Sequence, residues 1–477
     1  MAEDQNVSRR DFVKTAGAVT AAAAALPALQ GAPGIQTVKA ANDQVQYGLI
    51  GTGGRGTYLL KHLKGIDSGR CVALCDINEE HLKHGVDTIL TNPKTFKDYR
   101  ELLAMKDVDA VFITVPLFVH FPITKDALES GKHVFCEKCL VFKPEEVHAL
   151  RALKAQHPKQ TLQTGLQRRY SYFYQTVKQM VDKGILGDVH HIRAQWHRNL
   201  INEPSTAWSM KPGGDKNIDN WRIFRSMSGG YTAELMSHQS DISDWMFGSQ
   251  PEFVMGLGTI DTLKDGRDVY DNINVIAQYP KGQKFTYTSI STNQFLPFFN
   301  GQRAQMGEII MGTEGTVEIT VGFDAPVLPI AWWYREPPKK AAEVTKAGEK
   351  PKPFVAGATM VTGGGANGPI PIMTSDTQFT GKEGFLDREV KFARRWLMAK
   401  GIMLQEEQKN PVDSELEGFF ESCRTGKRPL ADMETGLADS VSVILTNMAM
   451  DQGRKVYFNE MDKLGVAQTA ATPAKKG

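Results

Sequence analysis

The feature of this sequence that most constrains its fold is a strand that runs directly into a glycine-rich turn. Residues 45–56 read VQYGLIGTGGRG, in which an apolar stretch leads into glycines spaced G-x-G-x-x-G. A helical pattern follows, and a second apolar stretch, CVALCD at 71–76, ends in an acid. In such a unit the glycines permit the tight turn, the close approach of a pyrophosphate and the packing of the helix on the strand. Asp76 lies about 20 residues past Gly56, the spacing at which a carboxylate reaches the ribose hydroxyls. The segment therefore predicts a dinucleotide-binding βαβ unit.

The predicted turn also bears on which dinucleotide binds. The helix after it presents N–H groups and the positive end of its dipole to an anion. Asp76 would repel a 2′-phosphate, which favours NAD over NADP, whereas Arg55 in the turn could accept that phosphate. The residues expected to contact the cofactor here are Gly51, Gly53, Gly54, Arg55, Gly56 and Asp76. A glycine-rich turn that binds no nucleotide is the alternative.

Strand and helix patterns continue to alternate after this unit. Apolar strand patterns at 107–116 and 132–138 are followed by helix patterns at 121–131 and 144–155. Such alternation predicts a doubly wound parallel sheet, whose ligands bind at the carboxyl ends of the strands. The residues at those ends are Thr114, Pro116, Glu137 and Lys138.

The stretch CEKC at 136–139 admits two other interpretations, a redox pair or half of a zinc site. Cys136 falls where a buried strand residue belongs, and redox pairs of this spacing begin a helix in a smaller fold. Zinc would need two further ligands, and the sequence has no second pair of cysteines at this spacing. We therefore predict no metal site, and Lys138 is the residue of interest in the stretch.

A second candidate group lies on the predicted helix at 229–248, GGYTAELMSHQSDISDWMFG. Glu234, His238, Asp241 and Trp245 recur at spacings that place them on one stripe of a helix. A glutamate and a histidine one turn apart can converge on a substrate hydroxyl. The alternative is a surface helix with an ordinary pair of residues four apart.

Aromatic and polar residues gather between these elements. Aromatic faces beside forked hydrogen-bond donors suit a sugar, which combines apolar C–H faces with many hydroxyls. Any one of them could instead pack or cap the sheet. The candidate substrate contacts are Arg169, Tyr172, Trp196, His197, Trp221, Arg222 and Asp241.

The N-terminus resembles the signal of the twin-arginine translocase, which exports folded proteins. Residues 8–14 read SRRDFVK, and an alanine-rich apolar stretch follows at 15–29. Residues 38–40 offer a cleavage site of small residues, and a retained membrane anchor is a second possibility. An amphipathic or disordered leader is the alternative. The prediction is export to the periplasm or another extracytoplasmic location, with the translocase as a partner.

Composition excludes some classes of protein. The chain of 477 residues has 56 basic and 54 acidic side chains and no long basic tract, so we expect no nucleic-acid partner. Its five cysteines are few for an exported protein that relies on disulfides. Cys71 and Cys75 fall about 13 Å apart in a predicted strand, which is too far for a bridge.

Taken together, these motifs resemble the Gfo/Idh/MocA family of nicotinamide-dependent sugar oxidoreductases. The resemblance covers roughly residues 46–320 and returns near GFFESCRTGKRP at 418–429. The residues that carry it are GTGGRG at 51–56, Asp76, VDAVFITVP at 108–116, ESGKHVFCEK at 129–138 and GTEGTVEI at 312–319.

The resemblance implies an α/β chain with two domains. The first is an N-terminal Rossmann domain with a doubly wound parallel sheet, and the second is a C-terminal α+β domain with a large, mostly antiparallel open sheet. The expected boundaries are a signal peptide at 1–41, the NAD(P)-binding domain at 42–165, the substrate and oligomerisation domain at 166–465 with an insertion or loop region at 321–384, and a disordered tail at 466–477.

The resemblance also implies roles for individual residues. The family's Glu-Lys-Pro becomes Glu137-Lys138-Cys139, and its Asp-x-x-x-His becomes Glu234 to His238. His238 would take the hydroxyl proton, Lys138 would hydrogen-bond the same oxygen, and Glu234 would orient substrate or histidine. His120 joins the expected cofactor contacts. The cofactor would be NAD, with NADP less favoured, and the chain would form a homo-oligomer, a dimer or tetramer.

Export leaves three functions open. Free nicotinamide nucleotides are not expected outside the cytoplasm, so a bound cofactor would have to be restored within each cycle. One function is an oxidoreductase that acts on a secondary hydroxyl of a sugar and recycles its cofactor internally. Another is a glycoside hydrolase that works by transient oxidation at C3, elimination and re-reduction. The third is a sugar-binding protein without activity.

Overall fold

The computed structural model describes residues 44–202, 208–293, 296–297, 303–321, 330–335, 370–373, 385–404 and 409–465. The predicted signal peptide at 1–41 and the predicted tail at 466–477 lie outside the described residues.

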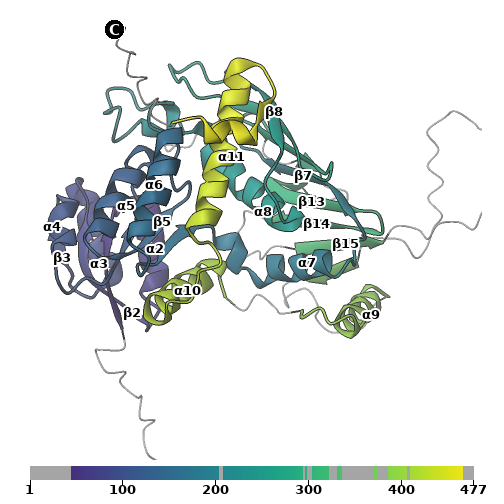
Figure 1. The fold of residues 1–477 in the computed structure, drawn as a ribbon, viewed down its shortest axis with the longest axis horizontal. Coiled ribbons are helices and arrows are strands. Elements are labelled where there is room, and N and C mark those ends of the chain that lie inside the picture. Colours follow the sequence, from purple (N-terminus) through teal and green to yellow (C-terminus); the bar gives the residue numbers. More distant parts are fainter. Residues whose placement is uncertain are drawn as a thin grey trace, which may run out of the picture. The chain divides into compact units, whose positions relative to one another are not determined.

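The first sheet has six parallel strands in the order β3-β2-β1-β4-β5-β6. Figure 1 labels β2, β3 and β5 of this sheet among helices α2 to α6. Its strands are β1 (Val45–Ile50), β2 (Gly69–Cys75), β3 (Lys94–Phe96), β4 (Ala110–Ile113), β5 (His133–Glu137) and β6 (Leu162–Gly165). The helices between them are α2 (Gly54–Leu63), α3 (Glu79–Ile89), α4 (Tyr99–Leu103), α5 (His120–Glu129) and α6 (Pro144–Gln156). The order reverses between β1 and β4, as in a Rossmann fold, and the predicted doubly wound parallel sheet is confirmed.

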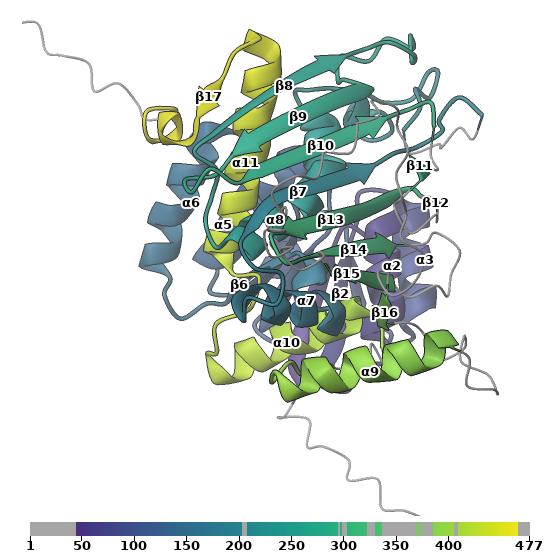
Figure 2. The ribbon, with the colours of Figure 1, turned by 90° about the vertical axis from the view of Figure 1, so that its right-hand side faces the viewer.

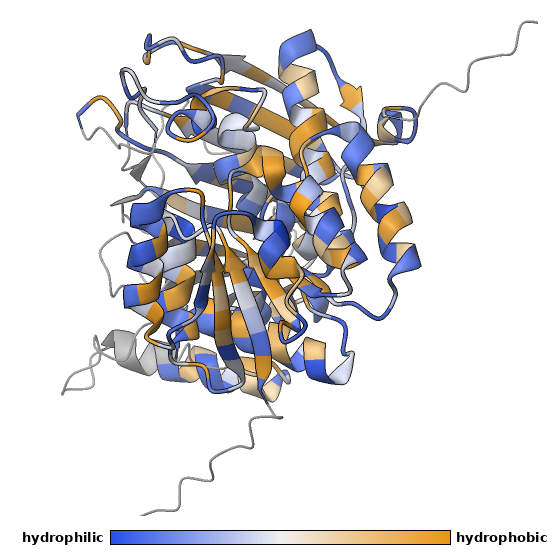
Figure 3. Ribbon diagram, turned by 90° about the vertical axis from the view of Figure 1, so that its left-hand side faces the viewer, coloured by the Kyte–Doolittle hydropathy of each residue, from blue (hydrophilic) through white to orange (hydrophobic). Residues whose placement is uncertain are grey.

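Helices cover both faces of this sheet, but not all of them come from the predicted βαβ units. The face that carries Tyr47, Phe112 and Phe135 is covered by α2, α3 and α10 (Pro411–Thr425). Helix α10 packs Phe419 and Phe420 on those three rings, with ring centroids 5.1–5.8 Å apart across the cluster. Each such buried apolar side chain contributes about 1.5–3 kcal/mol. In Figure 3 the strands at the centre of this region are coloured largely as hydrophobic.

The second sheet has nine strands in the order β16-β15-β14-β13-β7-β10-β9-β8-β17 (Figure 2). Only β7 and β10 pair in parallel, and the other neighbours are antiparallel, so the predicted mostly antiparallel sheet is confirmed. Its strands are β7 (Val189–Trp196), β8 (Phe253–Thr259), β9 (Asn272–Gln278), β10 (Lys284–Ile290), β13 (Met306–Gly312), β14 (Gly315–Val321), β15 (Ile330–Arg335), β16 (Ile370–Met373) and β17 (Val456–Tyr457). A separate short pair joins β11 (Leu296–Pro297) and β12 (Arg303–Ala304).

The segment 321–384, predicted as an insertion or loop region, contains two strands in its described parts. β15 pairs with β14, and β16 pairs with β15, so both extend the second sheet. The prediction rested on the high Pro, Gly and Lys content of the segment as a whole. That average does not reveal IAWWYR of β15, a short run of residues with high β-propensity.

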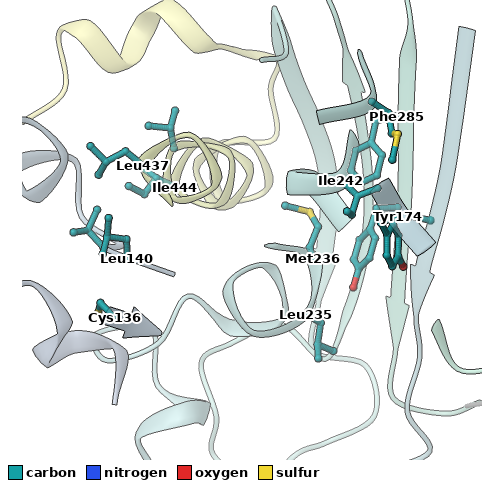
Figure 4. Close-up of a cluster of buried hydrophobic side chains, with 14 of the residues drawn as sticks. Cys136, Leu140, Tyr174, Leu235, Met236, Ile242, Phe285, Leu437 and Ile444 are labelled. Carbon is teal, nitrogen blue, oxygen red and sulfur yellow. The ribbon is translucent and has the colours of Figure 1, made fainter. Parts of the chain in front are cut away.

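Helix α11 (Met433–Gln452) connects the two sheets. It contacts β8 and α8 (Ser237–Phe247) on the side of the second sheet, and β6 and α6 on the side of the first. Figure 4 shows part of the buried cluster around it, with Leu437 and Ile444 of α11, Leu140 after β5, and Met236 near the start of α8. The two sheets therefore share one hydrophobic core, and Lys138, just after β5, contacts the segment that precedes α8. The remaining long helices are α7 (Tyr172–Asp182) and α9 (Phe385–Ala399).

Among the described helices, none is both long enough and apolar enough to cross a membrane.

Candidate active site

The glycine turn between β1 and α2 forms one end of the site. Gly51 has φ +95°, a conformation that favours glycine, and its N–H donates to the Cys75 carbonyl at 2.8 Å. A Cβ atom on Gly56 would lie 1.9 Å from the Gly51 oxygen, so α2 can approach the turn only with glycine there. A Cβ on Gly54 would meet nothing within 4 Å, so the helix N-terminus faces open space. The turn therefore presents bare backbone to a ligand.

Asp76 follows β2 and lies beside this turn. Its Oδ2 accepts hydrogen bonds from the Thr52 N–H at 2.7 Å and the Thr52 hydroxyl at 3.2 Å, and its Oδ1 accepts from the Asn78 N–H at 2.8 Å. The His81 Nδ1 lies 3.8 Å from the same carboxylate. Asp76 is therefore held rigidly at the end of β2, where a ribose would lie.

The exits of β4 and β5 form the middle of the site. Thr114 directs its hydroxyl to the Gly51 carbonyl at 2.6 Å, which ties the β4 exit to the glycine turn. Arg55 donates from Nε to Glu137 at 2.7 Å, which ties α2 to the end of β5. These bonds join three separate segments: the glycine turn with α2, the exit of β4 and the end of β5.

Lys138 reaches from the end of β5 to the segment just before α8. Its ammonium group donates to the Glu234 carbonyl at 2.8 Å and to the Ala233 carbonyl at 3.1 Å. An ammonium group has three N–H donors, so one remains for a ligand oxygen. Lys138 is half-buried and lines the cleft.

Glu234 and His238 enter the cleft from the other side, although the helix that carries them is not the regular one predicted. Residues Thr232–Met236 form a π-helical turn before α8 begins at Ser237. Such turns are frequent at functional sites. Burial raises the pKa of Glu234, but Arg222, whose Nε lies 3.3 Å from its carboxylate, and Lys138 more than offset this and hold the pKa below its usual value.

His238 is 7% exposed and lies beside the Trp196 ring, with 5.5 Å between ring centroids. Burial lowers its pKa well below the ordinary value, and the positive charges of Lys138, Arg168 and Arg55 lower it further. The imidazole is therefore neutral at pH 7, the state in which it can accept a proton.

His120, predicted as a cofactor contact, lines the cleft and also connects two of its walls. Its Nδ1 lies 2.7 Å from the Cys139 carbonyl and its Nε2 lies 2.9 Å from the Val115 carbonyl. Both nitrogens face acceptors, so both must carry protons. Burial alone would lower the pKa of His120, but the Cys136 sulfur and the two carbonyls raise it to about 9.

This arrangement predicts a loss of stability at alkaline pH. An unfolded histidine has a pKa near 6.5, so the contribution of His120 is complete below about pH 6.5 and is lost as pH rises through about 9, at a cost of about 3 kcal/mol. The free energy of unfolding, measured in urea across this range, should fall less steeply in His120→Asn than in the wild type. His84→Asn, on the exposed side of α3, is the control and should keep the wild-type slope. Equal slopes in all three proteins would contradict the assignment.

These walls enclose a cleft of about 950 Å³. It brings together most of the predicted site residues, from Asp76 at one end to His238 at the other. The predicted residues that line it are Gly51, Gly53, Gly54, Arg55, Asp76, Thr114, Pro116, His120, Glu137, Lys138, Trp196, Trp221, Arg222, Glu234 and His238. Gly56 lies behind the turn, where it packs α2 against β1.

Four residues predicted as substrate contacts are not among those that line the cleft: Arg169, Tyr172, His197 and Asp241. Arg169 and Asp241 instead form a buried pair, with 2.7–3.0 Å between their charged atoms. His197 is 2% exposed, and its Nε2 lies 2.8 Å from the Thr288 hydroxyl. These contacts support helix α8 and the second sheet, because polar residues near a site also satisfy one another in the core.

The cleft has further residues that the sequence analysis did not select. Gln167, after β6, presents a carbonyl oxygen Oε1 that is buried and has no hydrogen-bond partner in the described part of the chain. A position just after the last parallel strand was a usable signal for it. No local signal singled out the others, which include Ile77, Asn78, His81, Lys97, Tyr99, Arg100, Lys211, Asn217, Ile218 and Asp219.

The cysteines of CEKC lie in the protein interior. Cys136 and Cys139 are both buried and unbridged, and the Cys139 thiol lies 3.5 Å from the Ala233 carbonyl. Cys71 and Cys75 are likewise free and buried in β2. Over the residues that the structure describes, no group of three or more His, Cys, Asp or Glu is arranged to hold a metal ion.

The residues present fit a dinucleotide. The open space at Gly54 admits a pyrophosphate at the N-terminus of α2, and Asp76 stands where ribose hydroxyls would accept or donate hydrogen bonds. The fold and this cleft thus define a Rossmann-type dinucleotide-binding protein with a second, sheet-based domain beside the nicotinamide end.

Comparison with known families places the chain more narrowly. Residues 45–166 match the model of the oxidoreductase family with an NAD-binding Rossmann fold, GFO_IDH_MocA, and residues 174–318 match the GFO/IDH/MocA C-terminal domain. The chain belongs to the Gfo/Idh/MocA family, and the predicted membership is confirmed. Residues 6–26 match the twin-arginine translocation signal, which indicates export across a membrane.

Similar proteins were found in both sequence and structure. The uncharacterized oxidoreductase YrbE of Bacillus subtilis is 30% identical over 45% of this chain and 57% of its own length. Inositol 2-dehydrogenase/D-chiro-inositol 3-dehydrogenase of Halalkalibacterium halodurans is 28% identical over 44% of this chain and 55% of its own length. The matches thus span little more than half of these relatives.

Solved structures show the same fold at low sequence identity. The aldose-aldose oxidoreductase from Caulobacter crescentus, complexed with glycerol, has a TM-score of 0.62 at 18% identity, covering 87% of this chain and 99% of that chain. Levoglucosan dehydrogenase, in complex with NADH and levoglucosan, has a TM-score of 0.61 at 15% identity, again over 87% and 99%.

Proposed function

We propose that this chain is an NAD(P)-dependent oxidoreductase that acts on a secondary hydroxyl of a sugar or sugar derivative. The observation that carries the proposal is the convergence of Lys138, Glu234 and His238 on a cleft that also contains the glycine turn. Lys138 follows a strand of the first sheet, whereas Glu234 and His238 lie just before and at the start of α8, beside the second sheet. Side chains that served packing alone would not all be exposed to one cleft.

The chemistry follows from the state of each side chain. A ring nitrogen of the neutral His238 takes the proton of the substrate hydroxyl. Lys138 directs its remaining N–H toward the same oxygen and stabilises the negative charge that develops there. Glu234, held ionised beside Arg222, can accept a second substrate hydroxyl. A bound nicotinamide ring would supply hydride acceptance at the carbon of that hydroxyl.

The rest of the wall suits a sugar. Trp196 and Trp221 offer aromatic faces, and Arg222 and Gln167 offer hydrogen-bonding groups beside them. Among the relatives, the names of the inositol and levoglucosan dehydrogenases also point to polyol or sugar substrates.

Asp76 favours NAD over NADP in this proposal. Its carboxylate already accepts from Thr52 and Asn78, and a 2′-phosphate would bring a second negative charge to it. Export then requires that the protein carry its bound cofactor across the membrane. The oxidation state of that cofactor must be restored within each catalytic cycle, whether the protein is free in the periplasm or anchored to the membrane. The similar aldose-aldose oxidoreductase, by its name, couples two aldoses and offers a parallel for such recycling.

The test begins with protein purified after export. Denaturation and quantification of the released nucleotides should give close to one NAD(H) per chain. The loaded protein is then assayed with pairs of aldoses and with glycosides, in deuterated water. Product formed from an aldose pair supports the redox route, whereas deuterium at C2 of a sugar released from a glycoside supports transient C3 oxidation and hydrolysis. A protein that neither contains nor binds a nicotinamide nucleotide would refute the proposal and leave the non-catalytic sugar-binding alternative.

A further inference from the structure

The cleft has a wall that no dinucleotide motif accounts for. Lys211, Asn217, Ile218 and Asp219 line it, yet they belong to the connection between β7 and α8, far along the chain from the Rossmann strands. They share the cleft with Ile77, Asn78 and His81, which follow β2. Residues 208–220, here called the outer wall, therefore face the end of the cleft where the adenosine part of a dinucleotide belongs.

Side chains on both sides support this position. Asp219 accepts hydrogen bonds from Lys211 and from the Asp215 N–H, and it lines the same cleft as His81. His81 in turn lies 3.8 Å from Asp76, the predicted ribose contact. The outer wall thus lies opposite the ribose end of the nucleotide motif.

Hydrogen bonds within the outer wall give it a defined shape. Asn220, which is 4% exposed, accepts from the Lys211 N–H at 2.8 Å and donates to the Lys211 and Gly214 carbonyls at 3.2 Å each. Asp215 accepts from the Asn217 N–H at 2.7 Å, and the Lys211 ammonium lies 3.2 Å from Asp219. The segment is therefore a structured element rather than an open loop.

Both ends of the outer wall are attached to the second domain. Arg267 donates to the Trp208 carbonyl at 2.7 Å, and the Trp208 ring packs edge-on against Tyr231, with 5.3 Å between centroids. At the other end, Asn220 leads directly into Trp221 and Arg222, which line the catalytic end of the cleft. The outer wall thus leads directly to Arg222, whose Nε lies 3.3 Å from the Glu234 carboxylate.

Two exposed aliphatic side chains remain unexplained by packing. Ile77 is 67% exposed and Ile218 is 47% exposed, and both line the cleft, one from each domain. Binding is favoured when a ligand group covers exposed apolar surface in a cleft, because that surface is removed from water. The flat adenine base of a dinucleotide is a group that could cover these side chains.

From these observations we infer that the outer wall, through Ile218, covers the adenosine part of a bound dinucleotide and makes its release slow. The inference rests on the proposed function, because it requires that the cleft bind NAD(H). It deepens that function, since a cofactor held from both domains is what an exported enzyme without free nucleotide needs.

The test compares release of bound NADH from the full chain in three forms. Dissociation is followed by NADH fluorescence after addition of excess NAD. Ile218→Ser should release NADH about tenfold faster than the wild type, or more, because the covering side chain is lost. Ile201→Ser is the matched control: this isoleucine lies in the same connection, is 51% exposed and does not line the cleft. It should release NADH at the wild-type rate.

Hydrogen–deuterium exchange gives a readout that does not depend on the substitution. Amides of residues 211–219 should exchange more slowly in the wild type once NADH is bound. If the wild type binds NADH but Ile218→Ser releases it at the wild-type rate and the exchange is unchanged, the outer-wall inference is wrong while the proposed function stands. If the wild type binds neither NAD(H) nor NADP(H), both fail together.

Discussion

Replacing Lys138 by alanine should reduce turnover by about 10²–10⁴-fold while leaving the cofactor bound. The Lys138 ammonium group donates to the Ala233 and Glu234 carbonyls of the π-helical turn. Among the contacts described for that turn, it is the one cation that comes from the end of β5. Its third N–H is the donor that we assign to the substrate oxygen. Without it, the charge that develops on that oxygen loses the donor that we assign to it. The measurement is kcat and KM on the substrate identified by the aldose and glycoside assays.

Loss of activity in Lys138→Ala has to be separated from loss of structure. Lys138→Met keeps most of the apolar stem and removes the charge, so it should lose activity as Lys138→Ala does. Lys125→Ala is the matched control, because that lysine is 44% exposed and pairs with Glu129 on the surface of α5. Both Lys138 variants should retain one nucleotide per chain and a melting temperature close to that of the wild type. Full turnover in Lys138→Met would show that the ammonium group has no catalytic role.

Replacing His238 by alanine should have a comparable effect, about 10²–10⁴-fold on kcat/KM, because the general base is removed. The more specific expectation concerns pH in the wild type. Burial, with the nearby Lys138 and Arg168, lowers the pKa of His238 well below the ordinary value near 6.5. A base must be unprotonated, so the acid limb of the kcat/KM profile should fall well below pH 6.5.

The outcome discriminates between roles for this histidine. An acid limb at or above the ordinary histidine pKa would contradict the assignment of His238 as the base. His191→Ala is the control, since this histidine of β7 contacts the Thr286 hydroxyl at 3.1 Å and does not line the cleft. It should leave the profile unchanged. If His238→Ala keeps its activity, another group of the cleft acts as the base.

The residues that we propose to hold the cofactor lie together at the glycine turn, and the sequence could point to them because their signals are local. Gly51 needs a positive φ just after β1, Gly56 needs to admit the Gly51 carbonyl, and Asp76 directly follows the next strand. Each requirement acts within a few residues or across neighbouring strands, so it can be recognised in the sequence as particular residue types at particular spacings. The exits of β4 and β5, which contribute Thr114 and Glu137, follow from the same rule that parallel strands end at one edge of a sheet.

Of the residues predicted to contact substrate, only some line the cleft, because residue type alone does not say what a side chain faces. Arg169 and Asp241 have the chemistry of sugar contacts, but in the fold they bind each other. Trp221 and Arg222 have similar chemistry and do line the cleft. The difference is tertiary: Asp241 of α8 lies against Arg169 of the segment after β6, whereas Trp221 and Arg222 belong to the connection before α8, which borders the cleft.

Local patterns in this chain were thus sufficient to predict the doubly wound parallel sheet and its glycine turn, because these depend on the alternation of strand and helix patterns and on spacing within one turn. Only the tertiary structure placed α10, from residues 411–425, on the first sheet and residues 208–220 across the nucleotide cleft. Those contacts join segments more than a hundred residues apart, and they depend on complementary shape and on a shared core, which spacing along the chain does not encode.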